Sequence, residues 1–217
     1  NGIEEHKLTP VVNGGNCLGI YSNPGKYDTT FVPDYKLPRI SGRKTNLVYL
    51  SQSGAFMISR ISKLPNIEPL YAVSIGNQID LTVSDYLNYF KDDEEAKVFG
   101  VYVEGFLPAD GLAFAQAACQ IVRQEGKMVV LYKAGRTPEG RQATASHTAS
   151  VAGDYSVAKA ICEEAGVIVA DSIFDFENYV KNLSFLADKV VRGNRIALIS
   201  NAGFECVGRR KAKLVPG

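Results

Sequence analysis

The side chain best suited to group transfer in this chain is histidine, and the sequence holds only two. His147 lies in the run Ser146-His147-Thr148-Ala149-Ser150-Val151-Ala152-Gly153, among small residues that let other groups approach closely. A histidine in such a loop can act as a nucleophile, a proton shuttle, a metal ligand or a plain polar loop residue. No second histidine and no Asp, Glu or Cys cluster stands nearby at ligand spacing, so we expect no metal site. His6 lies in an unpatterned stretch and carries no chemical expectation.

A carboxylate, Glu104, follows the apolar run at residues 98–103. At that position it would be partly desolvated, which is costly unless the carboxylate has a partner. It could accept a hydrogen bond from one ring nitrogen of His147, which would fix the tautomer and leave the other nitrogen free to react. A solvated glutamate at the end of a strand is the alternative, and these residues alone leave both interpretations open.

Two loops carry groups suited to binding an anion. Ser51-Gln52-Ser53-Gly54 leads from an apolar run into a helical pattern, where free backbone N–H groups and the helix dipole can hold an anion. The residues by themselves favour a simpler role for Ser53, that of a helix N-cap. Lys133, Arg136 and Arg141 make the stretch before His147 basic, and such side chains suit phosphate oxygens. The alternative interpretation is a solvated loop. It is less favoured here because serine, glycine, lysine, arginine and histidine residues converge on the same sheet edge.

The elements that must position these residues alternate along the chain. We expect strands over 47–50, 70–75, 98–103, 128–132 and 167–170, and helices over 56–62, 81–90, 110–124, 154–164 and 174–187. This alternation predicts an α/β fold with a doubly wound parallel sheet of the flavodoxin type. Ligands bind such sheets beyond the carboxyl ends of the strands, which is where the polar residues stand.

Composition limits the classes of partner. The net charge of +1 gives no general attraction to nucleic acid or to a membrane surface, and no apolar run is long enough to cross a bilayer. The four cysteines are scattered without CxxC spacing, which indicates reduced thiols and a cytoplasmic location. We expect an irregular lead-in over 1–43, one α/β domain over 44–190, and the truncated start of a further α/β domain over 194–217.

The segments that carry these groups together resemble one family. They are Val48–Ala55, Ser74–Asn77, Tyr102–Gly105, Lys133–Arg136 and Ser146–Thr148. In this order they are similar to the nucleoside-diphosphate-forming acyl-CoA synthetases, which include ADP-forming acetyl-CoA synthetase and the α subunit of succinyl-CoA synthetase. The resemblance runs over about residues 13 to 205.

The resemblance implies a role for each matching residue. His147 would be transiently phosphorylated, and Glu104 would orient and stabilise it. Ser53 and Gly54 would cradle the phosphate at the start of a helix. Asn16 and Cys17 match a Gly-Pro-Asn-Cys loop near the acyl and CoA site, and Asn77 matches a further active-site loop. Two positions depart from the family pattern: Gly15 replaces a usual proline, which we expect to loosen the loop, and Ala149 replaces a frequent glycine with little expected effect.

The implied reaction interconverts acyl-CoA, ADP and phosphate with a carboxylic acid, CoA and ATP, through an acyl phosphate and a phosphohistidine. CoA and ATP or ADP with Mg²⁺ would be used by the complete enzyme, with none bound tightly by this chain. The partners implied are a CoA-binding Rossmann domain, an ATP-grasp domain or subunit, and further copies in an oligomer. Nothing in these residues separates acetate from succinate or a larger acid.

Two other functions compete with this one. An acyl hydrolase would use Ser53, Asp110 and His147 in the chain order of α/β-hydrolases, but Ser51 occupies the first glycine position of the G-x-S-x-G elbow. A flavodoxin-like binding module without turnover is the non-enzymatic alternative. The presence of both His147 and Glu104 disfavours it.

Overall fold

The computed structural model describes residues 10–33, 35–37, 42–137, 154–190, 193, 199 and 201–203. His147, Arg141 and most of the further domain expected over 194–217 lie outside these residues. The chain divides into two compact units, Asn1–Ala187 and Asp188–Gly217. All the helices and strands named below belong to the first unit.

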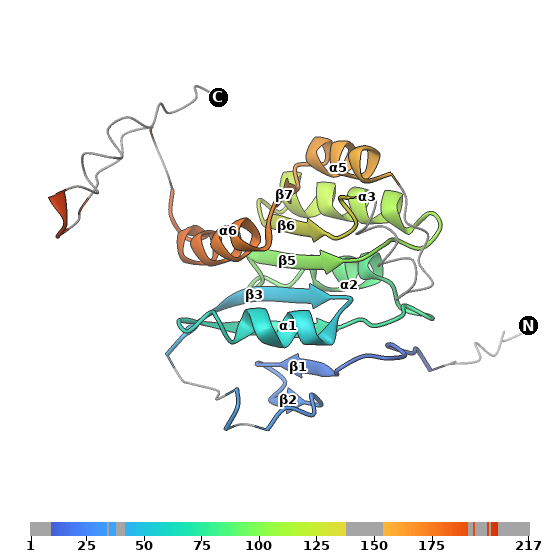
Figure 1. Cartoon of the computed structure of the whole chain (residues 1–217), viewed down its shortest axis with the longest axis horizontal. Helices are drawn as coiled ribbons and strands as arrows, with labels where there is room; N and C mark the ends of the chain where they lie inside the picture. The colour runs from blue at the N-terminus through green and yellow to red at the C-terminus, as the bar shows by residue number, and fades with distance from the viewer. Residues whose placement is uncertain are drawn as a thin grey trace, which may run out of the picture. The chain divides into compact units, whose positions relative to one another are not determined.

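A seven-stranded sheet with the order β2-β1-β4-β3-β5-β6-β7 forms the centre of the first unit (Figure 1). The strands are β1 Ile20–Ser22, β2 Tyr27–Asp28, β3 Lys44–Ser51, β4 Ile67–Ser74, β5 Val98–Val103, β6 Met128–Lys133 and β7 Ile168–Val169. The five strands from β4 to β7 are parallel, and their order is that of a flavodoxin-type sheet. The predicted fold class is confirmed.

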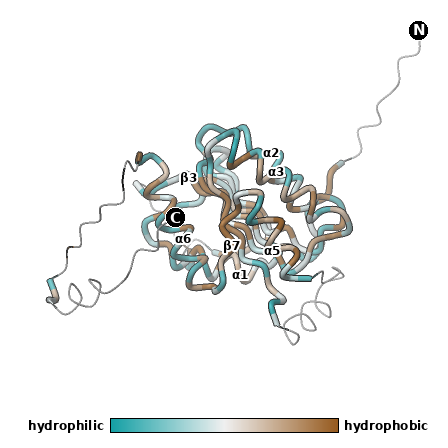
Figure 2. Tube along the Cα trace, turned by 90° about the horizontal axis from the view of Figure 1, so that it is seen from above, coloured by the Kyte–Doolittle hydropathy of each residue, from teal (hydrophilic) through white to brown (hydrophobic). Residues whose placement is uncertain are grey.

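Helices cover both faces of the sheet, as Figures 1 and 2 show. They are α1 Gly54–Ile61, α2 Val83–Phe90, α3 Asp110–Arg123, α5 Tyr155–Glu164 and α6 Ile173–Leu186. α1 and α6 pack on one face, and α2, α3 and α5 lie over the other. No helix in the part of the chain that the structure describes is long and apolar enough to span a bilayer.

The core has two layers because both faces of the sheet are covered. All six residues of β5 are buried, as expected for a central parallel strand. One layer centres on Met57 and Phe176, and the other on Phe114 and Leu87. These apolar strands place their polar carboxyl ends on one edge of the sheet.

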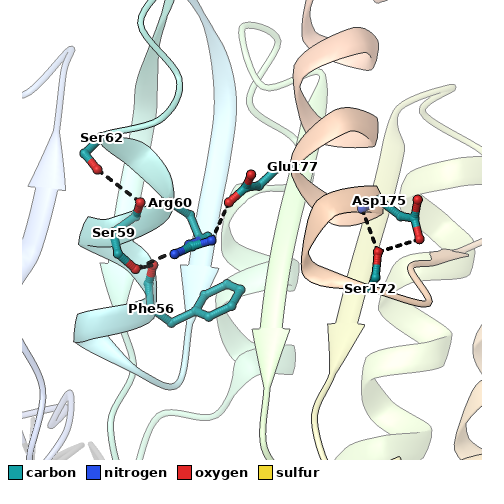
Figure 3. Close-up of polar contacts among 7 residues, drawn as sticks. All are labelled: Phe56, Ser59, Arg60, Ser62, Ser172, Asp175 and Glu177. Atoms are coloured by element: carbon teal, nitrogen blue, oxygen red, sulfur yellow. Dashed lines mark hydrogen bonds and ion pairs between the residues drawn. The ribbon is translucent and has the colours of Figure 1, made fainter.

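Polar contacts join α1 to α6 and cap the N-terminus of α6 (Figure 3). The guanidinium of Arg60 in α1 lies 2.6 Å from Oε1 of Glu177 in α6, with both side chains about one fifth exposed. Ser172 caps α6 by accepting from the Asp175 N–H at 3.0 Å. A partly exposed pair of this kind contributes about 1 kcal/mol or less, so the apolar contacts beneath it determine how α1 and α6 pack.

The expectation of an irregular lead-in was wrong for residues 20–28. β1 runs antiparallel to β4, with Tyr21 paired to Ala72, and β2 runs antiparallel to β1. Strands of three and two residues are too short to show a period in the sequence. Their pairing matters for function because it brings residues 12–19 to the carboxyl end of β4, where the Ser74 N–H bonds the Gly19 carbonyl at 3.0 Å.

Candidate functional site

A cavity of about 350 Å³ lies at the carboxyl ends of β3 and β5. It is lined by Asn16, Cys17, Leu18, Phe31, Gln52, Ser53, Gly54, Ala55, Asn77 and Glu104. The chain leaves β3 and β5 toward opposite faces of the sheet, to α1 and α3, which makes this the switch point where such sheets bind ligands. Six residues predicted from the sequence meet here: Asn16, Cys17, Ser53, Gly54, Asn77 and Glu104.

The start of α1 forms one wall of the cavity. Ser53 is the N-cap, and its Oγ accepts from the Phe56 N–H at 3.2 Å, so the capping interpretation describes this side chain. Gly54 and Ala55, the first helical residues, line the cavity. The partial positive charge of the helix N-terminus therefore lies at the cavity wall, where it favours an anion.

Glu104 forms the opposite wall and is partly buried, as its position after β5 predicted. The Tyr102 hydroxyl donates to Glu104 Oε1 at 3.3 Å. Burial, reinforced by this carboxylate, raises the pKa of Tyr102 well above its usual value, so the phenol stays protonated and keeps donating. The ring of Phe56 stacks on the Tyr102 ring with centroids 3.9 Å apart and thereby holds it in place. The predicted contact between Glu104 and His147 lies outside the described residues.

Two buried glutamines that the sequence did not single out hold the turn after β5. Gln52 Oε1 accepts from the N–H groups of Glu104 at 2.7 Å and Gly105 at 3.2 Å. Gln78 Nε2 donates to the Gly105 carbonyl at 3.4 Å, while its Oε1 accepts from the Val83 N–H at 3.2 Å. The sequence does contain one signal for Gln52: a glutamine stands between a buried strand and the start of a helix, and a buried amide needs hydrogen-bond partners.

The third wall comes from the lead-in segment, which backbone bonds fix to the loop after β4. The Asn77 N–H bonds the Gly15 carbonyl and the Ile79 N–H bonds the Gly14 carbonyl, both at 2.9 Å. The Leu18 N–H bonds Ser74 Oγ at 2.9 Å. These bonds anchor the loop on both sides of Asn16, and the loosening expected from Gly15 stays a prediction.

Asn13 ties this wall to α2. Its Nδ2 donates to the Ser74 carbonyl at 3.1 Å, and its Oδ1 accepts from the Tyr86 hydroxyl at 2.9 Å. These bonds join residues 61 and 73 positions apart. The place of Asn16 and Cys17 thus depends on contacts that no local pattern reveals.

Lys133 and Arg136 lie outside this cavity. Lys133 is buried and lines a second cavity of about 430 Å³ between α3 and α5. The guanidinium of Arg136 lies 3.2 Å from Asp171 Oδ1 and 5.5 Å from the centre of the Tyr155 ring. The expected convergence with Ser53 and Gly54 is not present in the described structure, and phosphate binding by these two cations stays a prediction.

The hydrolase interpretation finds no support in the position of Asp110. Asp110 is the first residue of α3, and its carboxylate accepts from the hydroxyl of Ser84 in α2. Asp110 does not line the cavity that holds Ser53. Ser53 Oγ is itself the helix cap. The described residues therefore do not assemble a serine triad.

An Asp110→Asn variant is expected to be more stable at pH 7 by about 1 kcal/mol, because burial raises the pKa of Asp110. A folded-state pKa above the unfolded value means that stability falls as pH rises through that range. The amide removes this penalty and can still accept from Ser84. Urea unfolding should show the gain at pH 7 and none at about pH 3, where the carboxyl is protonated in both states. Asp92→Asn, at an exposed position, is the control, and an equal gain at both pH values would contradict the prediction.

A Gly54→Ala variant tests how closely α1 and the lead-in wall approach. A Cβ at position 54 would lie 2.5 Å from Leu18 Cβ and 3.2 Å from Ser74 Oγ. Alanine favours a helix by about 1 kcal/mol over glycine, but overpacking costs about 1–3 kcal/mol, and we expect a net loss of unfolding free energy. Gly111→Ala in α3 is the matched control, since its Cβ would meet nothing closer than Phe106 at 3.4 Å and should stabilise. Equal gains from both variants, measured by urea unfolding, would refute the close approach.

The chain is similar in sequence to one domain family and to several known enzymes. Residues 44–183 match the family described as succinyl-CoA ligase like flavodoxin domain. The chain is 31% identical over 200 residues to acetate–CoA ligase [ADP-forming] II subunit alpha of Pyrococcus furiosus, covering 91% of this chain and 41% of that protein. It is 35% identical over 193 residues to acetate–CoA ligase [ADP-forming] of Methanocaldococcus jannaschii, covering 88% of this chain and 25% of that protein.

Solved structures agree. Acetyl-coenzyme A synthetase 1 of Ca. Korarchaeum cryptofilum, described as dinucleotide forming and solved with phosphate and ADP, matches with a TM-score of 0.71 and 33% identity, over 80% of this chain and 36% of that one. ATP citrate lyase of Methanothrix soehngenii shares the fold at 15% identity, with a TM-score of 0.62. The chain spans less than half the length of these relatives. It belongs to the succinyl-CoA ligase-like flavodoxin domain family.

Proposed function

We propose that this chain supplies the phosphoryl-carrying domain of an ADP-forming acyl-CoA ligase. The observation that supports this most is the cavity at the β3–β5 switch point, which gathers residues from five separate segments of the chain. The relatives named as ADP-forming acetate–CoA ligases support the same activity. His147 belongs to the connection between β6 and α5, which begins at the carboxyl edge of the sheet, the edge that bears the cavity.

The reaction begins with an acyl phosphate formed from acyl-CoA and phosphate. A ring nitrogen of neutral His147 attacks the phosphorus, the P–O bond to the acyl group breaks, and a carboxylate leaves. Imidazole suits this step because its pKa of about 6.5 leaves it neutral at cellular pH. ADP then accepts the phosphoryl group from the phosphohistidine, and every step can run in reverse.

The cavity residues supply positioning and charge stabilisation, which phosphoryl transfer chiefly requires. The N-terminus of α1 at Gly54 and Ala55 stabilises the phosphate oxygens through its dipole. Glu104 accepts from the second ring nitrogen of His147 and fixes the reactive tautomer. The Tyr102 hydroxyl, bonded to Glu104 Oε1, restricts the carboxylate in turn.

The complete enzyme requires parts beyond this domain. We infer a CoA-binding domain, which residues 1–43 follow, a further α/β ligase domain, of which residues 194–217 form the start, and a separate ATP-grasp domain or subunit that handles ATP and ADP. Among the described residues no group of three His, Cys, Asp or Glu is placed to hold a metal ion, and Mg²⁺ enters as part of the nucleotide substrate. An oligomeric enzyme in the cytoplasm completes the proposal.

Phosphoryl labelling tests this function. The chain, combined with its CoA-binding and ATP-grasp parts, is incubated with [γ-³²P]ATP. We expect a label on this chain that is lost in acid, survives base and is discharged by ADP. A label that survives acid, or none at all, would overturn the proposal. ATP formation from a panel of acyl-CoAs then identifies the acyl group.

A further inference from the structure

The peptide groups around Glu104 are held by side chains where the sheet ladder ends. β5 pairs with β3 as far as Tyr102, whose carbonyl accepts from the Gln52 N–H at 3.0 Å. Beyond that point the chain after β3 turns into α1, and no backbone carbonyl of β3 continues the ladder. Gln52 Oε1 takes that place by accepting from the N–H groups of Glu104 and Gly105.

The opposite side of the same turn is held by Gln78. Its Nε2 donates to the Gly105 carbonyl, so the two glutamines bond both polar groups of residue 105. Gln52 is 5% exposed and Gln78 is 2% exposed. A buried N–H without an acceptor costs about 1–3 kcal/mol, so the two bonds from Gln52 strongly favour one backbone position for Glu104.

We propose that Gln52 is a positioning residue for Glu104: by holding two consecutive N–H groups, its side-chain amide determines where the Glu104 carboxylate stands in the cavity. The inference rests on the proposed function, in which Glu104 orients His147. Backbone position and carboxylate position are fixed separately, the first by Gln52 and the second by Tyr102. A shift of the Glu104 Cα would move the carboxylate relative to the start of α1, and misplacement by about 1 Å can lower a rate about 10²-fold.

The chain offers a matched control for loss of a buried amide. Asn46 lies near the amino end of β3, whereas Gln52 directly follows the carboxyl end of the same strand. It is 3% exposed and donates to the Ser184 carbonyl at 3.0 Å. Asn46→Leu therefore removes a buried amide from β3 without touching the cavity.

The test compares variants in the reconstituted ligase. Gln52→Leu should lower the single-turnover rate of phosphohistidine formation about 10²-fold while the KM for acyl-CoA changes little. Gln52→Glu keeps an acceptor oxygen and should recover about tenfold of that loss. Asn46→Leu should lower the free energy of unfolding, measured in urea, but leave the rate unchanged. Gln52→Met replaces the leucine variant if that protein does not fold.

A double-mutant cycle decides whether Gln52 acts through Glu104. Glu104→Gln alone should lower the rate, and adding Gln52→Leu to it should cause little further loss. The positioning role would be overturned if Gln52→Leu lowered the rate equally in the native and the Glu104→Gln enzymes, or if Gln52→Glu recovered none of the rate. Either result would leave the proposed function standing. An unchanged rate in Glu104→Gln would overturn the orienting role of Glu104 and with it the positioning role of Gln52, whereas only the absence of phosphohistidine in the unsubstituted enzyme would overturn the proposed function.

Discussion

Replacing His147 with asparagine is expected to abolish phosphoryl labelling of this chain and to lower ATP formation at least ~10⁴-fold, because an amide nitrogen is not a nucleophile toward phosphorus. The formation of acyl phosphate from acyl-CoA and phosphate precedes His147 in the proposed sequence. We therefore expect ³²P-phosphate still to enter acyl phosphate in the variant. The two readouts separate loss of the carrier from loss of the whole site.

The other histidine in the chain provides the control. His6→Asn makes the same chemical change outside the predicted site and should retain both labelling and ATP formation. A His147→Asn enzyme that keeps an acid-labile label would show that the carrier is elsewhere. Loss of acyl phosphate formation together with the label would point instead to a collapsed site.

Gly76→Ala is expected to cost about 3 kcal/mol of unfolding free energy and to damage the cavity. Gly76 has a φ of +66°, and a Cβ there would lie 2.1 Å from the Gly15 carbonyl oxygen. Because the obstacle is backbone, it cannot rotate away, and the segment that carries Asn16 and Cys17 must shift. Activity of the reconstituted ligase should fall about tenfold or more as this wall moves.

Gly126→Ala separates the steric clash from backbone strain. Gly126 has a similar φ of +63°, but no atom lies within 4 Å of its added Cβ. It should therefore show only the cost of a left-handed alanine, about 1–2 kcal/mol, with unchanged activity. If urea unfolding gave equal losses for both variants, the contact between Gly76 and the lead-in segment would not be the cause.

The parallel part of the fold was predictable because each central strand is an apolar run between polar residues. β5 was predicted at its observed bounds, since Lys97 precedes it and Glu104 follows it. β1 and β2 were missed because β1 is stabilised by pairing with β4, some 50 residues away, and β2 by pairing with β1, and not by a local pattern. Strand preference depends on such context.

The site was predictable only to the level of the sheet edge. The rule that ligands bind beyond parallel strands placed Ser53 and Glu104 together, the family resemblance added Asn77, and all three line the cavity. The same rule does not say which crevice a loop faces, which is why Lys133 and Arg136 were expected beside them. The partners of Gln52 and Asn13 depend on contacts across more than 50 residues, which a chain pattern does not encode.

Both edges of the sheet end in strands of two residues, β2 and β7. In the described part of the chain, an added strand from another molecule would find few backbone groups to pair with at either edge. Short edges of this kind protect a sheet against edge-to-edge aggregation. Copies of this chain that assemble would therefore meet through side chains on helices and loops, and would not do so by extending the sheet.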